Sequence, residues 1–201
     1  RSQDRAIAGR PYDIKISQLI SDLAAQSTGD STLHPLLQRR EKVNRICIVH
    51  ITSNRGLCGG LNANINKLTG SFILEQNIPA TLVTVGRKGT EFMHRAHREI
   101  RAEFNDISDR PNQLETLPIS RIIIDDYINR YTDLVYLSYT RFINTFTQKP
   151  FLETLLPIKP AILPKTETKE YIYEPNSSMV LEGLLPRFIE MKIYHAILEA
   201  I

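Results

Sequence analysis

Both ends of the chain carry apolar residues at helical spacing. Near the start, Tyr12, Ile16, Leu19 (or Ile20) and Leu23 recur at steps of three and four, which predicts an amphipathic helix over residues 1–25. From residue 178 onward the apolar positions form two adjacent stripes, made of Leu181, Leu184, Phe188, Met191, Tyr194, Leu198 and Ile201, and of Leu185, Ile189, Ile193 and Ile197. A face this wide is not covered by a sheet alone. We therefore expect the two terminal helices to pair as an antiparallel, coiled-coil-like stem.

Prolines and the chain ends modify this picture of the stem. Pro11 and Pro186 lie inside the two helical patterns, so we expect a separate turn or a kink at the first and a kink or a restart at the second. The polar residues 26–31 stop the first helix and are typical of a mobile surface loop. The chain opens at Arg1 without a Met, and the last stripe ends without a capping residue. We expect both stem helices to be interrupted at these ends.

Between the terminal helices, β-branched runs alternate with stretches of helical spacing. Strands are predicted over residues 45–52, 80–85, 99–104 and 133–142, and helices over residues 61–76, 87–96 and 119–130. The first run is apolar on both faces, as in the middle of a parallel sheet. This alternation predicts an α/β fold of the doubly wound class, with a mostly parallel sheet and right-handed crossovers. An edge strand or hairpin is expected after residue 151, with a short β patch at 171–173.

The domain organisation follows from these patterns. We predict an N-terminal stem helix, a loop, an α/β domain and a C-terminal stem helix, at residues 1–25, 26–44, 45–175 and 176–201. The chain has 201 residues, of which 42% are hydrophobic and 23% charged, which excludes disordered and fibrous classes. No apolar run approaches the roughly 18 residues that cross a bilayer, so any membrane link is expected to go through partners. Two cysteines exclude a disulfide scaffold and indicate a reducing compartment.

The net charge of +3 is concentrated in one segment. Residues 87–101 hold five Lys or Arg side chains against Glu91 and Glu99, so this segment carries the whole excess and the rest of the chain is neutral. Nucleic-acid binding would have to rest on this patch, which contains one aromatic residue, Phe92, for stacking. A solvated helix face followed by a strand is the favoured interpretation.

The sharpest local signal is a Gly-rich turn, TSNRGLCGGLN at residues 52–62, between a buried strand and a helix. Phosphates bind at such places because glycines let backbone N–H groups approach them at a helix N-terminus. The spacing of Gly56, Gly59 and Gly60 nevertheless matches neither of the common nucleotide-binding patterns, and no Lys directly follows it. The turn is therefore either purely conformational, with glycines at positive φ or in close helix–strand packing, which we favour, or a nucleotide site.

Other candidate chemistry has a structural interpretation that we favour. Cys58 near a helix N-terminus would be a nucleophile only with a base, for which His50 is the nearest in sequence. Three further groups have candidate spacing, namely a metal site at Glu91, His94 and His97, a solvated pair at Asp125 and Asp126, and a glycosylation pattern at Asn176–Ser178 that is better explained as a helix cap. No catalytic set, cofactor or metal is predicted. The pattern favours a mechanical or adhesive part of a larger assembly.

The turn also carries a family resemblance. Its residues Ser53, Arg55, Gly56, Cys58, Gly59, Gly60 and Asn62 resemble the signature S-[DN]-[RK]-G-L-C-G-[GAS]-[YFL]-N of the gamma subunit of the rotary F-type ATP synthase. Further stretches agree in the same order, namely Tyr139–Asn144 ahead of Leu155–Pro157, then Tyr173–Pro175, then Leu184–Ala200 with Glu190 and Tyr194. The match spans essentially all 201 positions.

The resemblance implies a central-stalk, non-catalytic rotor subunit with a Rossmann-like domain, no cofactor and no bound nucleotide. It implies coupling of proton flow to ATP synthesis, with the epsilon subunit, the c-subunit ring and the alpha/beta catalytic hexamer as partners. By family position, Tyr173 and Glu174, and secondarily Arg10 and Tyr12, are expected near the ring, at the end opposite the interrupted helices. The cysteine pair of the chloroplast versions is absent. A peripheral place on the cytoplasmic side of a bacterial membrane is therefore favoured over the mitochondrial inner membrane.

Overall fold

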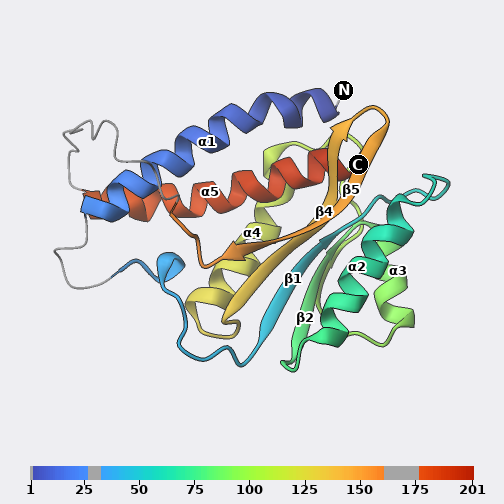
Figure 1. Cartoon of the computed structure of the whole chain (residues 1–201), viewed down its shortest axis with the longest axis horizontal. Coiled ribbons are helices and arrows are strands. Elements are labelled where there is room, and N and C mark those ends of the chain that lie inside the picture. Colours follow the sequence, from blue (N-terminus) through green and yellow to red (C-terminus); the bar gives the residue numbers. More distant parts are fainter. Residues whose placement is uncertain (1, 27–32, 161–176) are drawn as a thin grey trace.

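A computed structural model describes residues 2–26, 33–160 and 177–201 of the chain. Two helices of 25 and 24 residues open and close it, α1 (Ser2–Gln26) and α5 (Ser177–Ala200). Between them lie η2 (Pro35–Leu37), β1 (Ile46–Ile51), α2 (Leu61–Glu75), β2 (Ala80–Val85), α3 (Arg87–Arg95), β3 (Ile100–Phe104), α4 (Gln113–Ile128), β4 (Leu134–Asn144) and β5 (Thr147–Leu156) (Figure 1). None of these described helices has a stretch long and apolar enough to cross a bilayer.

The five strands form one sheet in the order β3-β2-β1-β4-β5. The pairs β1–β2, β2–β3 and β1–β4 are parallel, and only the hairpin of β4 and β5 is antiparallel. The predicted α/β class with a mostly parallel sheet is therefore confirmed. The strand order reverses between β1 and β4, which makes the carboxyl end of β1 the topological switch point of the sheet.

Each face of the sheet is covered by its own layer of helices, which explains why β1 is buried along its whole length. On one face, Cys47, Val49 and Ile51 of β1 pack into the large cluster that also contains residues of α1, α4 and α5. On the other face, Ile48 joins a smaller cluster with Ile73 of α2, Leu82 of β2 and Met93 of α3. Alternate residues of one strand thus serve two cores.

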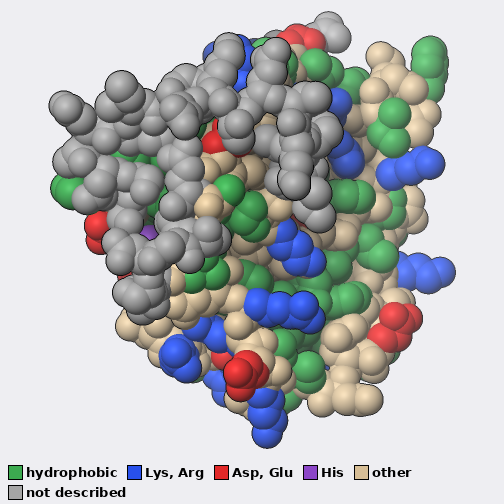
Figure 2. Space-filling view, turned by 60° about the vertical axis from the view of Figure 1, so that its left-hand side comes forward, with side chains coloured by type: hydrophobic (Ala, Val, Ile, Leu, Met, Phe, Trp, Pro, Cys, Tyr) green, Lys and Arg blue, Asp and Glu red, His purple; other side chains and the backbone are tan. Residues whose placement is uncertain are grey.

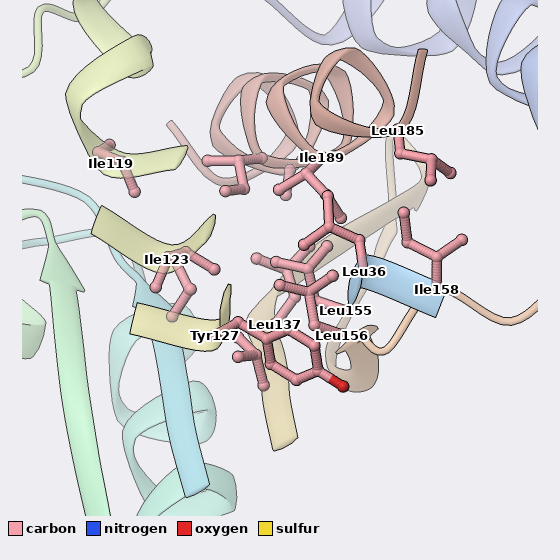
Figure 3. Packing of buried hydrophobic residues seen from close by; sticks show 14 of the residues in the cluster. Leu36, Ile119, Ile123, Tyr127, Leu137, Leu155, Leu156, Ile158, Leu185 and Ile189 are labelled. Carbon is pink, nitrogen blue, oxygen red and sulfur yellow. The ribbon is translucent and has the colours of Figure 1, made fainter. Parts of the chain in front are cut away.

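The large cluster is where α5 meets the sheet. Figure 3 shows Leu185 and Ile189 of α5 facing Leu137, Leu155 and Leu156 of the β4–β5 hairpin, with α4 beside them. The second predicted stripe, Leu185, Ile189, Ile193 and Ile197, is completely buried. The first stripe is buried at Leu181, Met191 and Leu198 and partly exposed at Leu184, Phe188 and Tyr194. Burying a side chain of this size stabilises the fold by about 1.5 to 3 kcal/mol.

The two terminal helices run antiparallel, side by side over the same face of the sheet (Figure 1). The predicted pairing is confirmed, but two details differ. Both helices continue through their prolines, Pro11 and Pro186, so neither a separate turn nor a restart occurs. The buried stripe of α1 runs through Ile16, Ile20 and Leu23, whereas Tyr12 is 47% exposed and does not belong to it.

Two element boundaries lie earlier than predicted. Helix α4 begins at Gln113 because Asn112 and Glu115 form a reciprocal capping box, and the helix continues through Pro118. Strand β5 begins at Thr147 and includes Pro150, which an edge strand tolerates because one side of it has no partner strand. The predicted loop at 27–31, the β patch at 171–173 and the cap at Asn176 lie outside the described residues.

Basic side chains are prominent on the surface. On the face shown in Figure 2, Lys and Arg side chains lie among hydrophobic ones. One polar depression of about 790 Å³ is lined by Arg39, Arg40, Lys42, Arg45 and Arg130, together with Glu41 and Asp133. Asp133 accepts hydrogen bonds from the backbone N–H groups of Asn44 and Arg45, and so fixes the entry to β1.

Gly86 sets the path from β2 into α3. Its φ is +95°, and a Cβ atom there would lie 2.0 Å from the carbonyl oxygen of Thr52. Only glycine fits both conditions. Gly183, in the exposed part of α5, has open space around its Cα and no such constraint.

These two glycines should respond oppositely to alanine. Gly86→Ala is expected to lower the free energy of unfolding by roughly 2 to 4 kcal/mol, because it adds a backbone clash to a strained φ. Gly183→Ala is expected to raise it by about 0.5 to 1 kcal/mol through helix propensity. Urea unfolding of both variants measures the difference, and equal effects would contradict the role given to Gly86.

Candidate functional site

The Gly-rich signature turn follows β1 and therefore lies at the switch point of the sheet. In open α/β sheets the crevice outside the carboxyl ends of the strands, at this point, is the usual ligand site. Here the turn spans residues 52–60 and leads into α2, whose N-cap position is Gly60 and has no side-chain cap. The location matches the one that the sequence predicts, a loop between a buried strand and a helix.

Side chains of the turn bond mainly to the turn itself. Asn62 Nδ2 donates to the carbonyl oxygen of Arg55 at 3.1 Å and to Ser53 Oγ at 2.9 Å, while Asn62 Oδ1 accepts from the Ser53 backbone N–H at 3.3 Å. Ser53 Oγ donates to the Arg55 carbonyl at 2.8 Å, and Cys58 Sγ to the Gly56 carbonyl at 3.4 Å. Both ends of the Asn62 amide are thus used to close the turn, which accounts for its shape without a ligand.

Neighbouring loops hold the turn from outside. Asn54 Nδ2 donates to the Ile107 carbonyl at 2.9 Å, and Asn54 Oδ1 accepts from the Arg87 backbone N–H at 3.0 Å. Arg55 pairs with Asp109 at 2.5 Å. The turn is therefore tied to the start of α3 and to the loop after β3, so the carboxyl ends of three parallel strands are joined by side chains.

The glycines of the turn are explained by backbone conformation better than by close packing. Gly59 has a φ of +58°, and nothing lies within 4 Å of the place where a Cβ atom would be, while Gly56 has only Lys88 near that place, at 3.8 Å. The predicted close packing of helix on strand is therefore wrong as an explanation of Gly56 and Gly59. The tip residue Leu57 also has a positive φ, +60°, and is fully exposed. The expected positive φ is confirmed for Gly59.

His50 is a buried, hydrogen-bonded residue. Its Nε2 lies 2.7 Å from Asn66 Oδ1 and its Nδ1 lies 3.0 Å from Thr69 Oγ1, which in turn contacts Ser138 Oγ at 2.6 Å. Burial lowers the pKa of His50 to about 4, so the ring is neutral at pH 7. With both nitrogens engaged by α2, His50 is not available as a base for Cys58, and the nucleophile hypothesis fails on this geometry.

His50 should give the fold a specific acid sensitivity. Its folded-state pKa of about 4 lies below the unfolded value of 6.5, so the unfolded state binds the proton first and stability falls as the pH drops from about 6.5 towards 4. Between pH 7 and pH 5 this group should cost about 2 kcal/mol. Urea midpoints of wild type and His50→Gln at both pH values test this.

The comparison concerns the pH dependence and not the absolute stability, since His50→Gln also disturbs the core. The exposed His97→Gln variant is the control and should keep the wild-type dependence. A His50→Gln variant that loses as much stability between pH 7 and pH 5 as the wild type would contradict the assignment.

A second site of close contact lies between α1 and α5. A Cβ atom on Gly9 would be 2.5 Å from His195 Cε1 and Nε2, so the absence of a side chain at residue 9 makes room for this ring. On its other side, His195 Nδ1 lies 2.8 Å from Asp13 Oδ2, one helical turn further along α1. The imidazole is 10% exposed and wedged between the two helices.

Arg10 forms the next contact along the pair. Its guanidinium donates to the Phe142 carbonyl of β4 at 2.8 Å and to Glu199 Oε1 at 3.1 Å, and Glu199 Oε2 accepts from the Phe142 N–H at 3.0 Å. Three elements are therefore joined at one point. Arg10 lies beside the last turn of α5, so the expectation that it sits at the end of the structure opposite residues 1 and 201 is wrong, and the same holds for Tyr12. Tyr173 and Glu174 lie outside the described residues.

The remaining candidate groups have local partners. His94 pairs with Glu103, Glu91 pairs with Lys88, and His97 lies beyond the end of α3 with a φ of +52°. The predicted helical spacing of a metal site therefore does not hold, and within the described ranges no group of three or more such side chains is placed to bind a metal. Burial raises the pKa of Cys47 to about 12, which keeps it a thiol.

Asp125 and Asp126 differ from the expectation of a solvated pair. Asp125 is exposed, but Asp126 accepts two hydrogen bonds from the Arg101 guanidinium, at 3.1 and 3.3 Å. This pair joins α4 to β3, two elements of different layers. No periodic signal predicts it, because the two residues are 25 positions apart.

Sequence reasoning also misses the contacts between α1 and α5. From the sequence, Gly9 is expected to interrupt the helix, and no pattern marks His195 or Glu199 as contact residues. One signal is present, since in an antiparallel pair residues spaced by about one turn, Arg10 and Asp13, face residues spaced by one turn, Glu199 and His195. Without the register of the pair, that spacing identifies no partner.

The fit of Gly9 against His195 can be tested by a double-mutant cycle. Gly9→Ala is expected to lower the free energy of unfolding by about 1 to 3 kcal/mol, because the methyl group displaces the ring from Asp13. In a His195→Ala background the same change should raise it by about 0.5 to 1 kcal/mol, since only helix propensity then remains. Urea unfolding of the four proteins measures the coupling, and additive effects would contradict the contact.

The fold and these contacts define an α/β protein whose terminal helices form a locked antiparallel pair on one face of a mostly parallel sheet. A family model described as ATP synthase matches residues 1–201. Chains named ATP synthase gamma chain from Dehalococcoides mccartyi and Moorella thermoacetica are 54% and 41% identical to it, over 100% of this chain and 70% of each relative. The chain belongs to the ATP synthase gamma chain family.

Solved structures support the same fold at lower identity. A chain of the Tetrahymena thermophila mitochondrial ATP synthase central stalk and c-ring structure matches with a TM-score of 0.68 at 17% identity, covering 99% of this chain and 90% of that one. A chain of the Euglena gracilis mitochondrial ATP synthase rotor matches with a TM-score of 0.56 at 17% identity, covering 99% and 83%. At these identities the likeness concerns the fold alone.

Proposed function

We propose that this chain is a central-stalk part of a rotary F-type ATP synthase, which couples proton flow through the c-subunit ring to ATP synthesis in the alpha/beta hexamer. The observation that carries the proposal is the helix pair of α1 and α5, locked to the sheet through Arg10, Glu199 and the backbone of Phe142. A stalk has to resist twisting between its helices and its body. A contact that joins both helices and a strand at one point supports that role.

The role we propose is non-catalytic. The signature turn is closed by its own hydrogen bonds through Asn62 and Ser53, and His50 is held by Asn66 and Thr69. These contacts support a conformational role for the glycines over the alternative of a nucleotide-binding α/β protein. In this proposal the alpha/beta hexamer binds and hydrolyses the nucleotides, and this chain requires no cofactor.

The partners we propose are the epsilon subunit, the c-subunit ring and the alpha/beta hexamer, with this chain peripheral on the cytoplasmic side of a bacterial membrane. The α/β domain, residues 45–175, would dock on the ring, and the stem helices, residues 1–25 and 176–201, would extend toward the hexamer. Tyr173 and Glu174 are our candidates for ring contact by family position. Tyr12 lies on the same stretch of α1 as Arg10, beside the last turns of α5, and is therefore no longer a candidate for this contact.

A chimera tests the function directly. Residues 1–201 would replace the matching 70% of the Moorella thermoacetica gamma chain, which is 41% identical, within the complete ATP synthase. We expect the purified complex to retain ATP-driven proton pumping, measured by quenching of a pH-sensitive dye in vesicles. Pumping requires a chain that transmits rotation, so ATP hydrolysis without pumping would contradict the proposal.

Substitutions in this chimera test the ring contact separately. Tyr173→Ala together with Glu174→Ala should weaken binding of the chimera to isolated c rings by at least about tenfold, that is, by about 1.4 kcal/mol. Tyr12→Ala, measured alongside, is the control and should leave binding to the c ring unchanged. Unchanged binding would remove Tyr173 and Glu174 from the interface while leaving the pumping result, and hence the rotor function, intact.

A further inference from the structure

A groove between α2 and α3 is an apolar surface feature that the contacts described above leave unexplained. It has a volume of about 660 Å³ and lies on the face of the sheet away from the helix pair. Its apolar lining consists of Ala63, Gly70, Leu74, Phe92, Met93 and Ala96. Leu74 is 72% exposed although it lies next to these apolar residues, so this groove presents a hydrophobic strip to solvent.

The groove has a strongly one-sided charge. Lys67, Lys88, Arg95 and Arg98 line it, and none of its described lining residues is Asp or Glu. Lys88 pairs with Glu91, outside the groove. Lys67, Arg95 and Arg98 form no ion pair with any of the described residues. Three of the four belong to residues 87–101, the segment that carries the whole net charge of the chain.

One of these cations is left incomplete inside the protein. The Nε atom of Arg98 is buried and has no hydrogen-bond acceptor among the described residues. A buried donor without an acceptor destabilises the fold, and more so when it belongs to a charged group. The terminal N–H groups of the same guanidinium, which lines the groove, can donate two parallel hydrogen bonds to a carboxylate that arrives from outside.

We propose that the α2–α3 groove binds an acidic amphipathic helix of a partner protein. Two neighbouring helices form a groove that accepts a third, with apolar anchors in the floor and charges at the rim. Leu74 and Phe92 supply apolar contacts for the anchors, and Arg95, Arg98 and Lys67 meet carboxylates on either side. Helix α2 has 15 residues, so a helix of about the same length, roughly 22 Å, matches the groove.

The lining argues for a protein helix over two other anions. Single-stranded nucleic acid needs aromatic side chains on which successive bases stack, and Phe92 is the only aromatic lining residue of the groove among those described. A membrane surface would contact a convex, basic face, whereas here the apolar strip lies in a hollow between two helices. The hollow and its cationic rim together fit an amphipathic segment.

A fluorescently labelled peptide tests the proposal on the complete chain. The peptide has about 15 residues, with Leu at positions i, i+3, i+4 and i+7 and Glu on the flanks, and a matched peptide carries Lys at every Glu position. Anisotropy should show saturable binding of the acidic peptide with a dissociation constant below about 0.1 mM, and at least about tenfold weaker binding of the basic one. No saturation up to about 1 mM would overturn the proposal.

Matched variants locate the binding in the groove. Leu74→Gln and the double change Arg95→Gln with Arg98→Gln should each weaken binding at least about tenfold. Leu114→Gln on α4 removes an equally exposed leucine, and Arg110→Gln with Arg121→Gln removes two exposed charges, so these controls should leave binding within about twofold. Equal losses in both sets would overturn the assignment to the groove.

The partner class is tested by competition. A single-stranded oligonucleotide or phosphatidylglycerol vesicles should not displace the bound peptide at low micromolar concentration. If either binds the chain with the same dependence on Leu74, Arg95 and Arg98 while the acidic peptide does not bind, the groove serves nucleic acid or lipid and the proposal is wrong.

Discussion

The close approach of α1 and α5 is the constraint on which the rest of the structure depends. At Gly9 the helix backbone of α1 comes so near to His195 that no side chain fits between them. That approach fixes the register of the pair, because Asp13 and Arg10 then reach His195 and Glu199. The register in turn decides which stripe of α5 faces the sheet, since the same helix has to bury a second stripe against β4 and α4.

Because α5 packs both on α1 and on the sheet, the helix pair is part of the core of the described residues. One hydrophobic cluster includes Ile16 and Ile20 of α1, Ile193 of α5 and Val49 and Leu137 of the sheet. A force that rotates α1 and α5 against the sheet would have to disturb this cluster and the Arg10–Glu199–Phe142 contact together. In the role that we propose for the chain, this coupling lets the helices and the α/β body turn as one unit.

Periodicity predicts the elements well because it reports burial, and burial is what most residues of this fold share. The alternation of strands and helices, the parallel sheet and the antiparallel terminal pair all follow from apolar spacing. Specific polar contacts do not follow, since Arg101 with Asp126 or Arg10 with Phe142 join residues far apart in sequence. The spacing of Asn112 and Glu115 fits a capping box and could have predicted the start of α4. Pro118 instead suggests that the helix begins later.

The signature turn shows why composition is a weaker guide to a site than spacing. Glycine, serine and asparagine at a switch point are the residues that nucleotide folds use for phosphates, and here they occupy the same place in the sheet. In this chain Ser53 and Asn62 direct their donors to the Arg55 carbonyl, an acceptor within the turn, instead of into the crevice. Asn54 bonds to the start of α3 and to the loop after β3. Since a donor satisfied by a rigid neighbour gains little from a ligand, the crevice is better suited to holding strands together than to binding phosphate.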